Sequence, residues 1–115
     1  MARGLLVALV NVKEGQQEAF DKWYIQEHLD HTAQAPRFLS GNVYRFVDTY
    51  GEYPTKPPQY LAFYELDTDD HEAALEALHE YNSKAGGHGV PEGWVPAEFT
   101  AAGWYVFERS VHTKG

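Results

Sequence analysis

Two histidines continue a stripe of aromatic side chains near the start of the chain. At helical spacing Phe20, Tyr24, His28 and His31 fall on one face, at steps of four, four and three residues. The aromatic half of this face would pack in a core, and the imidazole half would then line a cavity. Alternatively, the helix end emerges into solvent and its histidines are surface residues.

His28 is the first candidate for a general acid or base, with Trp23 on the neighbouring stripe. Imidazole has an ordinary pKa close to neutrality, which suits proton abstraction next to a carbonyl group. Burial between helix and sheet would lower the pKa of His28, because the charged form loses hydration. The alternative role is structural, with the imidazole capping the end of the helix.

Aromatic residues in the predicted strands supply candidate hydrogen-bond donors. The O–H or N–H groups of Tyr44, Tyr64 and Trp104 could polarise a substrate oxygen, as an oxyanion stabiliser does. Tyr64 is a catalytic candidate, and the other two are candidates for substrate binding. Each of the three would also serve as an ordinary core residue.

A metal site is the rival use of the histidines. His28 and His31 with Glu27 offer nitrogen and oxygen ligands on one helical surface, and His79 or His88 could complete the set. Because Glu27 points about a quarter turn away from His28, no metal is expected. The glycines around His88 are not followed by the Lys and helix of a phosphate-binding loop, which argues against a nucleotide.

The composition restricts the class of protein. A chain of 115 residues has the size of a single domain, residues 1–115. Its formal charge of -8 would repel nucleic acid and an anionic membrane surface. It contains no cysteine, so thiolate catalysis and cysteine-bound metals are excluded. The first apolar run is about nine residues long, too short to span a bilayer, and no signal-peptide pattern follows, so a cytoplasmic protein is expected.

The order of the predicted elements is strand, helix, strand, strand, helix, strand. Residue patterns predict strands at 5–12, 38–48, 60–66 and 99–110, and helices at 16–33 and 70–81. This order is typical of a ferredoxin-like βαββαβ fold of the α+β class, with a four-stranded antiparallel sheet.

One face of this sheet is expected to lack cover within the subunit. Two helices can cover only one face, yet the first, third and fourth predicted strands are apolar at both odd and even positions. A homodimer in which two sheets pack face to face would bury the second face. A monomer would expose an aromatic sheet and would be poorly soluble.

Two long loops separate these elements. Residues 49–58 contain three prolines, and residues 82–96 contain four glycines together with His88 and Trp94. Loops of this length in a compact domain are more often functional than not. The second loop is predicted to act as a lid over the pocket, with its glycines as hinges and Trp94 as an apolar cover.

Short motifs follow one another in the first half of the chain: Trp23-Tyr24, Glu27-His28, Pro36-Arg37-Phe38, Gly41 and Tyr44-Arg45. Their order and spacing resemble the signature of the EthD-like branch of the dimeric α+β barrel superfamily. The chain departs from that signature at Arg37, where glycine is usual, so the bend before the second strand is expected to differ.

The resemblance implies a dimer with a pocket in each subunit between the sheet and the helices. The superfamily includes polyketide cyclases, lactone isomerases, haem-degrading members and cofactor-free monooxygenases that oxidise quinols. Cyclase-like members carry a histidine in the segment after the second helix, which His79 and His88 bracket here. Asn11, at the end of the first predicted strand, resembles the asparagine of the cofactor-free monooxygenases.

Together, the residues and the resemblance predict a small cofactor-independent enzyme that acts by acid–base chemistry on an apolar aromatic, polyketide-like or lactone substrate. His28, His88 and Tyr64 are the catalytic candidates. The substrate-binding candidates are Trp23, Tyr24, His31, Tyr44, His79, Trp94, Trp104 and Asn11. Cyclisation, dehydration and isomerisation need the same groups and stay open. The alternatives are a cofactor-free monooxygenase of quinol-type substrates and a non-catalytic ligand-binding protein.

Overall fold

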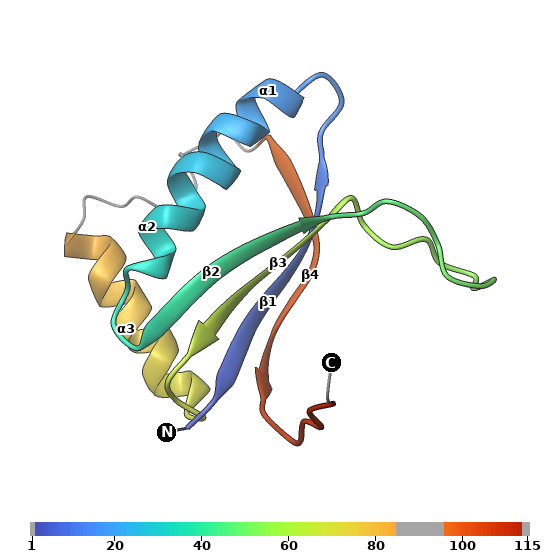
Figure 1. Cartoon of the computed structure of the whole chain (residues 1–115). Coiled ribbons are helices and arrows are strands. Elements are labelled where there is room, and N and C mark those ends of the chain that lie inside the picture. Colours follow the sequence, from blue (N-terminus) through green and yellow to red (C-terminus); the bar gives the residue numbers. More distant parts are fainter. Residues whose placement is uncertain (1, 85–95, 114–115) are drawn as a thin grey trace.

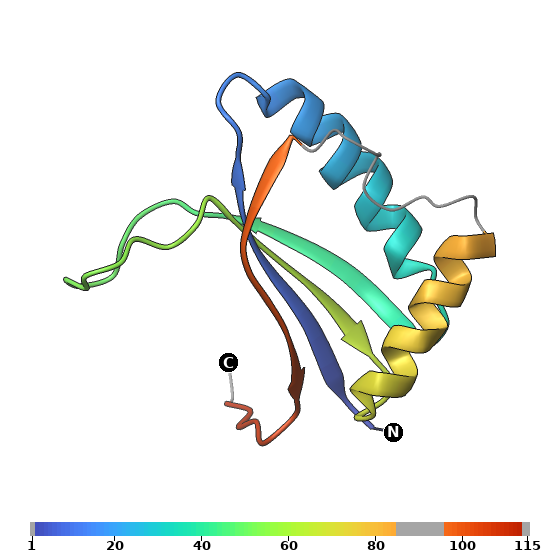
Figure 2. The same cartoon turned by 180° about the vertical axis from the view of Figure 1, so that it is seen from behind.

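The computed structural model describes residues 2–84 and 96–113 (Figures 1 and 2). Its strands are β1 (Gly4–Val12), β2 (Phe38–Arg45), β3 (Tyr60–Leu66) and β4 (Ala97–Val106). Its helices are α1 (Gln17–Phe20), η1 (Asp21–His28), α2 (Leu29–Ala33) and α3 (His71–Lys84), of which the first three run on without a break. The strands pair antiparallel in the order β2-β3-β1-β4. The predicted ferredoxin-like α+β fold is confirmed.

The helices pack on one face of the sheet, and the core lies beneath them (Figures 1 and 2). β3 shows the division between the two faces. Tyr60, Ala62, Tyr64 and Leu66 alternate along the strand and are all buried, whereas Leu61, which points the other way, is 40% exposed. The described residues on the helix side form two buried clusters, one beneath α1 and η1 and one beneath α2 and α3.

The other face of the sheet, which we call the open face, is apolar and is covered by no element of the described chain. Tyr44 of β2 and Tyr105 of β4 are each 59% exposed there. The rings of Tyr44 and Phe63 stack on this face, with their centroids 5.8 Å apart. The structure therefore has one sheet face covered by helices and one uncovered face, as the strand patterns predicted.

Three elements end at other residues than the sequence predicted, and β4 begins at Ala97 rather than at residue 99. β4 ends at Val106 because its neighbour β1 begins at Gly4, and the last bond of the ladder runs from the Phe107 amide to the Arg3 carbonyl. β2 ends at Arg45, and residues 46–59 then extend away from the sheet (Figure 1). α3 continues to Lys84, where an ion pair of 2.9 Å with Glu80 supports its last turn.

The helix of residues 71–84 begins at a side-chain cap. The Asp70 carboxylate accepts a hydrogen bond of 3.1 Å from the Ala73 amide, and the Thr68 hydroxyl accepts one of 3.0 Å from the Asp70 amide.

In the part of the chain that the structure describes, no helix combines the length and the apolar character needed to cross a bilayer.

Arg37 occupies the bend before β2 in a left-handed backbone conformation, with φ at 72°. Glycine adopts this conformation without strain, whereas other residues lose roughly 1–2 kcal/mol. The bend is fixed by a bond of 2.8 Å from the Asp67 amide to the Arg37 carbonyl. Arginine at this position therefore holds the backbone in the region that glycine favours.

Arg37→Gly is expected to stabilise the fold by about 0.5–1 kcal/mol, because relief of the backbone strain exceeds the added flexibility of the unfolded chain. Urea unfolding of the purified variants would measure this change. Arg37→Ala is the matched control, since it removes the exposed side chain but keeps the strain. A glycine variant less stable than the alanine variant would contradict the assignment of strain.

Candidate active site

The candidate active site begins in η1, which has the i→i+5 hydrogen-bond pattern of a π-helix. Such segments are rare and occur frequently at functional sites. The adjacent residues Trp23 and Tyr24 are both buried, at 7% and 2% exposure. At the α-helical spacing of 3.6 residues per turn, the sequence placed Trp23 on the stripe next to that of Tyr24. The wider π-helical turn changes the angle between successive side chains, so that spacing does not apply here.

His28 lies at the end of η1, half-buried, with its Nδ1 atom buried. Its ring stacks on Trp23, with the centroids 5.0 Å apart and the planes 25° from parallel. The Tyr24 ring lies 5.5 Å away. An imidazolium in this position would be stabilised by the face of the indole. Trp23 is therefore placed to stabilise a positive charge on His28.

Tyr24, whose ring contacts this imidazole, has a second buried tyrosine, Tyr64, as its neighbour. Burial raises the pKa of Tyr24 well above its usual range, and the neighbouring Tyr64 hydroxyl raises it further. Burial also raises the pKa of Tyr64 to about 12, although the side chain of Thr32 lowers it in part. Both hydroxyls therefore remain protonated at neutral pH and can act as hydrogen-bond donors.

The Tyr64 hydroxyl oxygen is buried and makes no hydrogen bond of standard geometry with the described residues. Thr32, only 5% exposed, is close enough to influence its pKa. A phenolic hydroxyl both donates and accepts, so a ligand or a water molecule could bond to this group together with Thr32. We call Trp23, Tyr24, His28, Thr32 and Tyr64 the His28 cluster.

Gly41 allows the helix and the sheet to approach at this point. It lies opposite Tyr64 in the β2–β3 ladder. A Cβ atom at Gly41 would come within 3.1 Å of Leu29 Cδ1 and 3.2 Å of Tyr64 Cε1. The absence of a side chain thus leaves space for α2 and for the Tyr64 ring on the same patch of sheet.

His31 joins the first helix to α3. Its Nε2 atom lies 3.1 Å from the Asn82 side-chain oxygen, and its ring lies 4.8 Å from that of Tyr81. The Tyr81 hydroxyl donates a bond of 2.9 Å to the His31 carbonyl. These contacts give His31 a role in holding the two helices together, about one turn beyond His28.

The structure places the other predicted site residues apart from this cluster. Tyr44 projects from the open face, and His79 is exposed on α3. The Asn11 side-chain oxygen accepts the Gln59 amide at 2.9 Å, at the end of the sheet. Trp104 packs at the edge of the buried cluster that contains Tyr64. His88, Trp94 and most of the predicted lid lie outside the described residues.

Two contributors to the site were missed by sequence reasoning. Thr32 follows His28 by four residues, a helical spacing that could have identified it. Phe99 of β4 packs its ring 5.9 Å from that of Tyr24, and nothing in the local pattern indicates that contact. In residues 2–84 and 96–113, no group of three or more His, Cys, Asp or Glu side chains could hold a metal ion.

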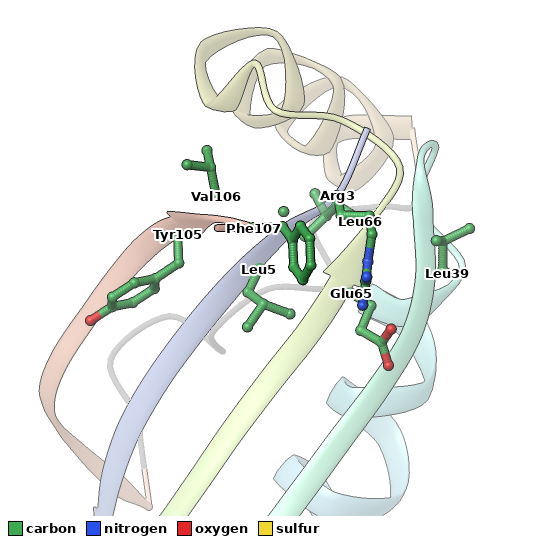
Figure 3. Close-up of a pocket in the computed structure, with 9 residues that line it drawn as sticks. Arg3, Leu5, Leu39, Glu65, Leu66, Tyr105, Val106 and Phe107 are labelled. Atoms are coloured by element: carbon green, nitrogen blue, oxygen red, sulfur yellow. The ribbon is translucent and has the colours of Figure 1, made fainter. Parts of the chain in front are cut away.

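A separate cavity of about 360 Å³ opens on the open face, near the end where β1 begins. Leu5, Glu65 and Tyr105 are register partners and line it together with Leu39 and Phe107 (Figure 3). The Arg3 guanidinium lies over the Phe107 ring, 4.2 Å from its centroid. This cavity is on the opposite side of the sheet from the His28 cluster.

Two solved structures align with this chain over nearly its full length. A proposed monooxygenase from Shewanella loihica PV-4 superposes with a TM-score of 0.59 at 19% sequence identity, over 98% of this chain and 99% of that chain. A proposed antibiotic biosynthesis monooxygenase from Chloroflexus aurantiacus J-10-fl gives a TM-score of 0.45 at 17% identity, over 100% of both chains. No family model and no curated protein sequence matches the chain. At this identity, the first structure shows a shared fold.

Proposed function

We propose that this protein is a small cofactor-free monooxygenase of a quinol-type aromatic substrate. The observation that carries the proposal is the contact of the His28 ring with Tyr24, a buried and protonated tyrosine that has the buried, protonated Tyr64 as its neighbour. The likeness in fold to the proposed monooxygenase from Shewanella loihica supports this reaction class over the acid–base cyclases, lyases and isomerases that the sequence favoured.

The proposed reaction starts with proton transfer from a phenolic O–H group of the substrate to His28. The resulting anion is stabilised by the tyrosine hydroxyls, which need no reorganisation as its charge develops. It gives one electron to O₂, and the two radicals combine at a ring carbon to form a peroxide. The His28 imidazolium returns its proton to the outer peroxide oxygen, the O–O bond breaks, and the departing hydroxide takes the proton on that carbon, which releases water and leaves a carbonyl group. The overall change is quinol plus O₂ to hydroxyquinone plus water.

The cyclase, lyase and isomerase alternatives share the first step. Each requires a base such as His28 and donors that stabilise an oxyanion, but none consumes O₂. A non-catalytic binding protein would use the same residues without any proton transfer. Oxygen consumption is therefore the measurement that separates the proposed function from the alternatives.

With hydroquinone as the probe, we expect protein-dependent O₂ uptake and hydroxyquinone that carries one ¹⁸O atom when the reaction is run under ¹⁸O₂. An oxygen electrode and mass spectrometry would measure the two quantities. His79→Gln, which changes an exposed histidine of α3, should retain the full rate and controls for histidine content. No protein-dependent O₂ uptake with hydroquinone, or hydroxyquinone without ¹⁸O, would contradict the proposed reaction.

We also propose that the open face binds a second copy of the chain. On this face three large side chains, each from a different strand, are 40–59% exposed: Tyr44 of β2, Leu61 of β3 and Tyr105 of β4. An exposed apolar surface that crosses a whole sheet is typical of a protein interface. The dimer would be the dimeric α+β barrel that the sequence motifs resemble.

A further inference from the structure

We propose that a second site, at the base of the loop between β2 and β3, binds a small organic carboxylate. A cavity of about 480 Å³ lies there, within the size range of small-molecule sites. Arg45 and Lys56 both line it, and none of the described residues in its wall is acidic. The site shares no residue with the His28 cluster, so it is independent of the proposed function.

The two cations are unusual in so acidic a chain. The sequence has 9 Lys and Arg residues against 17 Asp and Glu residues, yet two of the cations line one cavity. Within residues 2–84 and 96–113, neither Arg45 nor Lys56 forms an ion pair, unlike Lys84 with Glu80. The Lys56 ammonium lies 5.6 Å from the centroid of the Phe46 ring, which orients it by a cation–π contact. Their charge is therefore available to an anion.

The amide side chains in the wall also present donors. The Asn11 oxygen accepts the Gln59 backbone amide at 2.9 Å, and the Gln59 side-chain oxygen accepts the Val12 amide at 2.6 Å. Both side-chain oxygens already accept a hydrogen bond. Asn11 and Gln59 therefore offer their NH₂ groups as donors to a ligand. A ligand in the cavity would meet a guanidinium, an ammonium and two amide NH₂ groups.

This set of donors selects the chemistry of the ligand. A carboxylate accepts hydrogen bonds only, and its two oxygens match the fork of an arginine. Phe46, Pro57 and Tyr60 add apolar surface to the same wall, which would pack against a hydrocarbon or aromatic body. Gln17 connects the wall to the first helix, donating to the Tyr60 hydroxyl at 3.1 Å and to Asp21 at 2.8 Å.

Calorimetric titration with benzoate would test this site in the full-length protein. We expect saturable binding, weakened about tenfold or more by Arg45→Gln and by Lys56→Gln, because each removes a charged hydrogen bond. Lys84→Gln is the matched control and should bind benzoate like the wild type. Arg45 and Lys56 are both exposed, so Arg45→Gln and Lys56→Gln should melt at the wild-type temperature.

Three results would overturn the proposal. In the first, the Arg45→Gln/Lys56→Gln double variant binds benzoate as tightly as the wild type. In the second, benzyl alcohol binds as tightly as benzoate. In the third, the protein binds inorganic phosphate but not benzoate. His28→Gln should bind benzoate normally. A failure at this site is therefore distinguishable from a failure of the proposed oxygenase reaction.

Discussion

His28→Gln is expected to lower turnover about 10²–10⁴-fold, the usual contribution of a positioned general base. Glutamine keeps a polar side chain of similar reach but has no titratable nitrogen. The half-buried imidazole stacks on Trp23 and lies 5.5 Å from the Tyr24 ring. These contacts place a proton acceptor in an aromatic setting beside the buried Tyr24, so its loss should affect the chemical step more than substrate binding.

Initial rates and thermal melts on the same purified variant would separate a catalytic role from a structural one. If His28 is the base, turnover falls, the protein stays folded, and the pH profile of kcat/KM loses one of its limbs. If His28 only supports the helix end, stability should fall by about 1 kcal/mol with turnover per folded molecule unchanged. The exposed His79→Gln variant should show neither change. Full activity in a folded His28→Gln protein would end the proposed mechanism.

Leu61→Glu is expected to convert a dimer into a monomer. Leu61 lies on the open face, opposite Leu9 of β1 and Tyr44 of β2 in the sheet register. Packing of two open faces would bury this position in each copy, and an unpaired carboxylate buried at an interface costs several kcal/mol. We expect the dimer dissociation constant to rise by at least about 10³-fold, equivalent to about 4 kcal/mol.

Sedimentation at micromolar concentration would measure the effect. The wild type should sediment at twice the chain mass of 13.0 kDa, and the variant at the chain mass. Leu75→Glu is a matched control, because Leu75 is 38% exposed, close to the 40% of Leu61, but lies on α3 rather than on the sheet. A wild-type monomer, or a variant that remains dimeric, would contradict the assignment of the open face as the interface.

The order of the elements and the fold could be predicted from the sequence, because helix and strand patterns report local burial. Phe20 and Tyr24 were correctly predicted to face the core, and alternation correctly grouped Tyr44 with Asn42 on one side of β2. Alternation cannot indicate which side the helices cover, since that depends on how distant strands pair. The register that sets Gly41 opposite Tyr64 is what directs Tyr44 to the open face.

The composition of the His28 cluster was decided by tertiary structure. No local pattern predicts the π-helical turn that buries Trp23 beside Tyr24, since helix periodicity in a sequence is read at 3.6 residues per turn. Nor does any pattern bring Tyr64 of β3 to Thr32 of α2, because the two are 32 residues apart and meet only when the helix packs on the sheet. A catalytic site depends on such long-range contacts, whereas sequence periodicity reports only near neighbours along the chain.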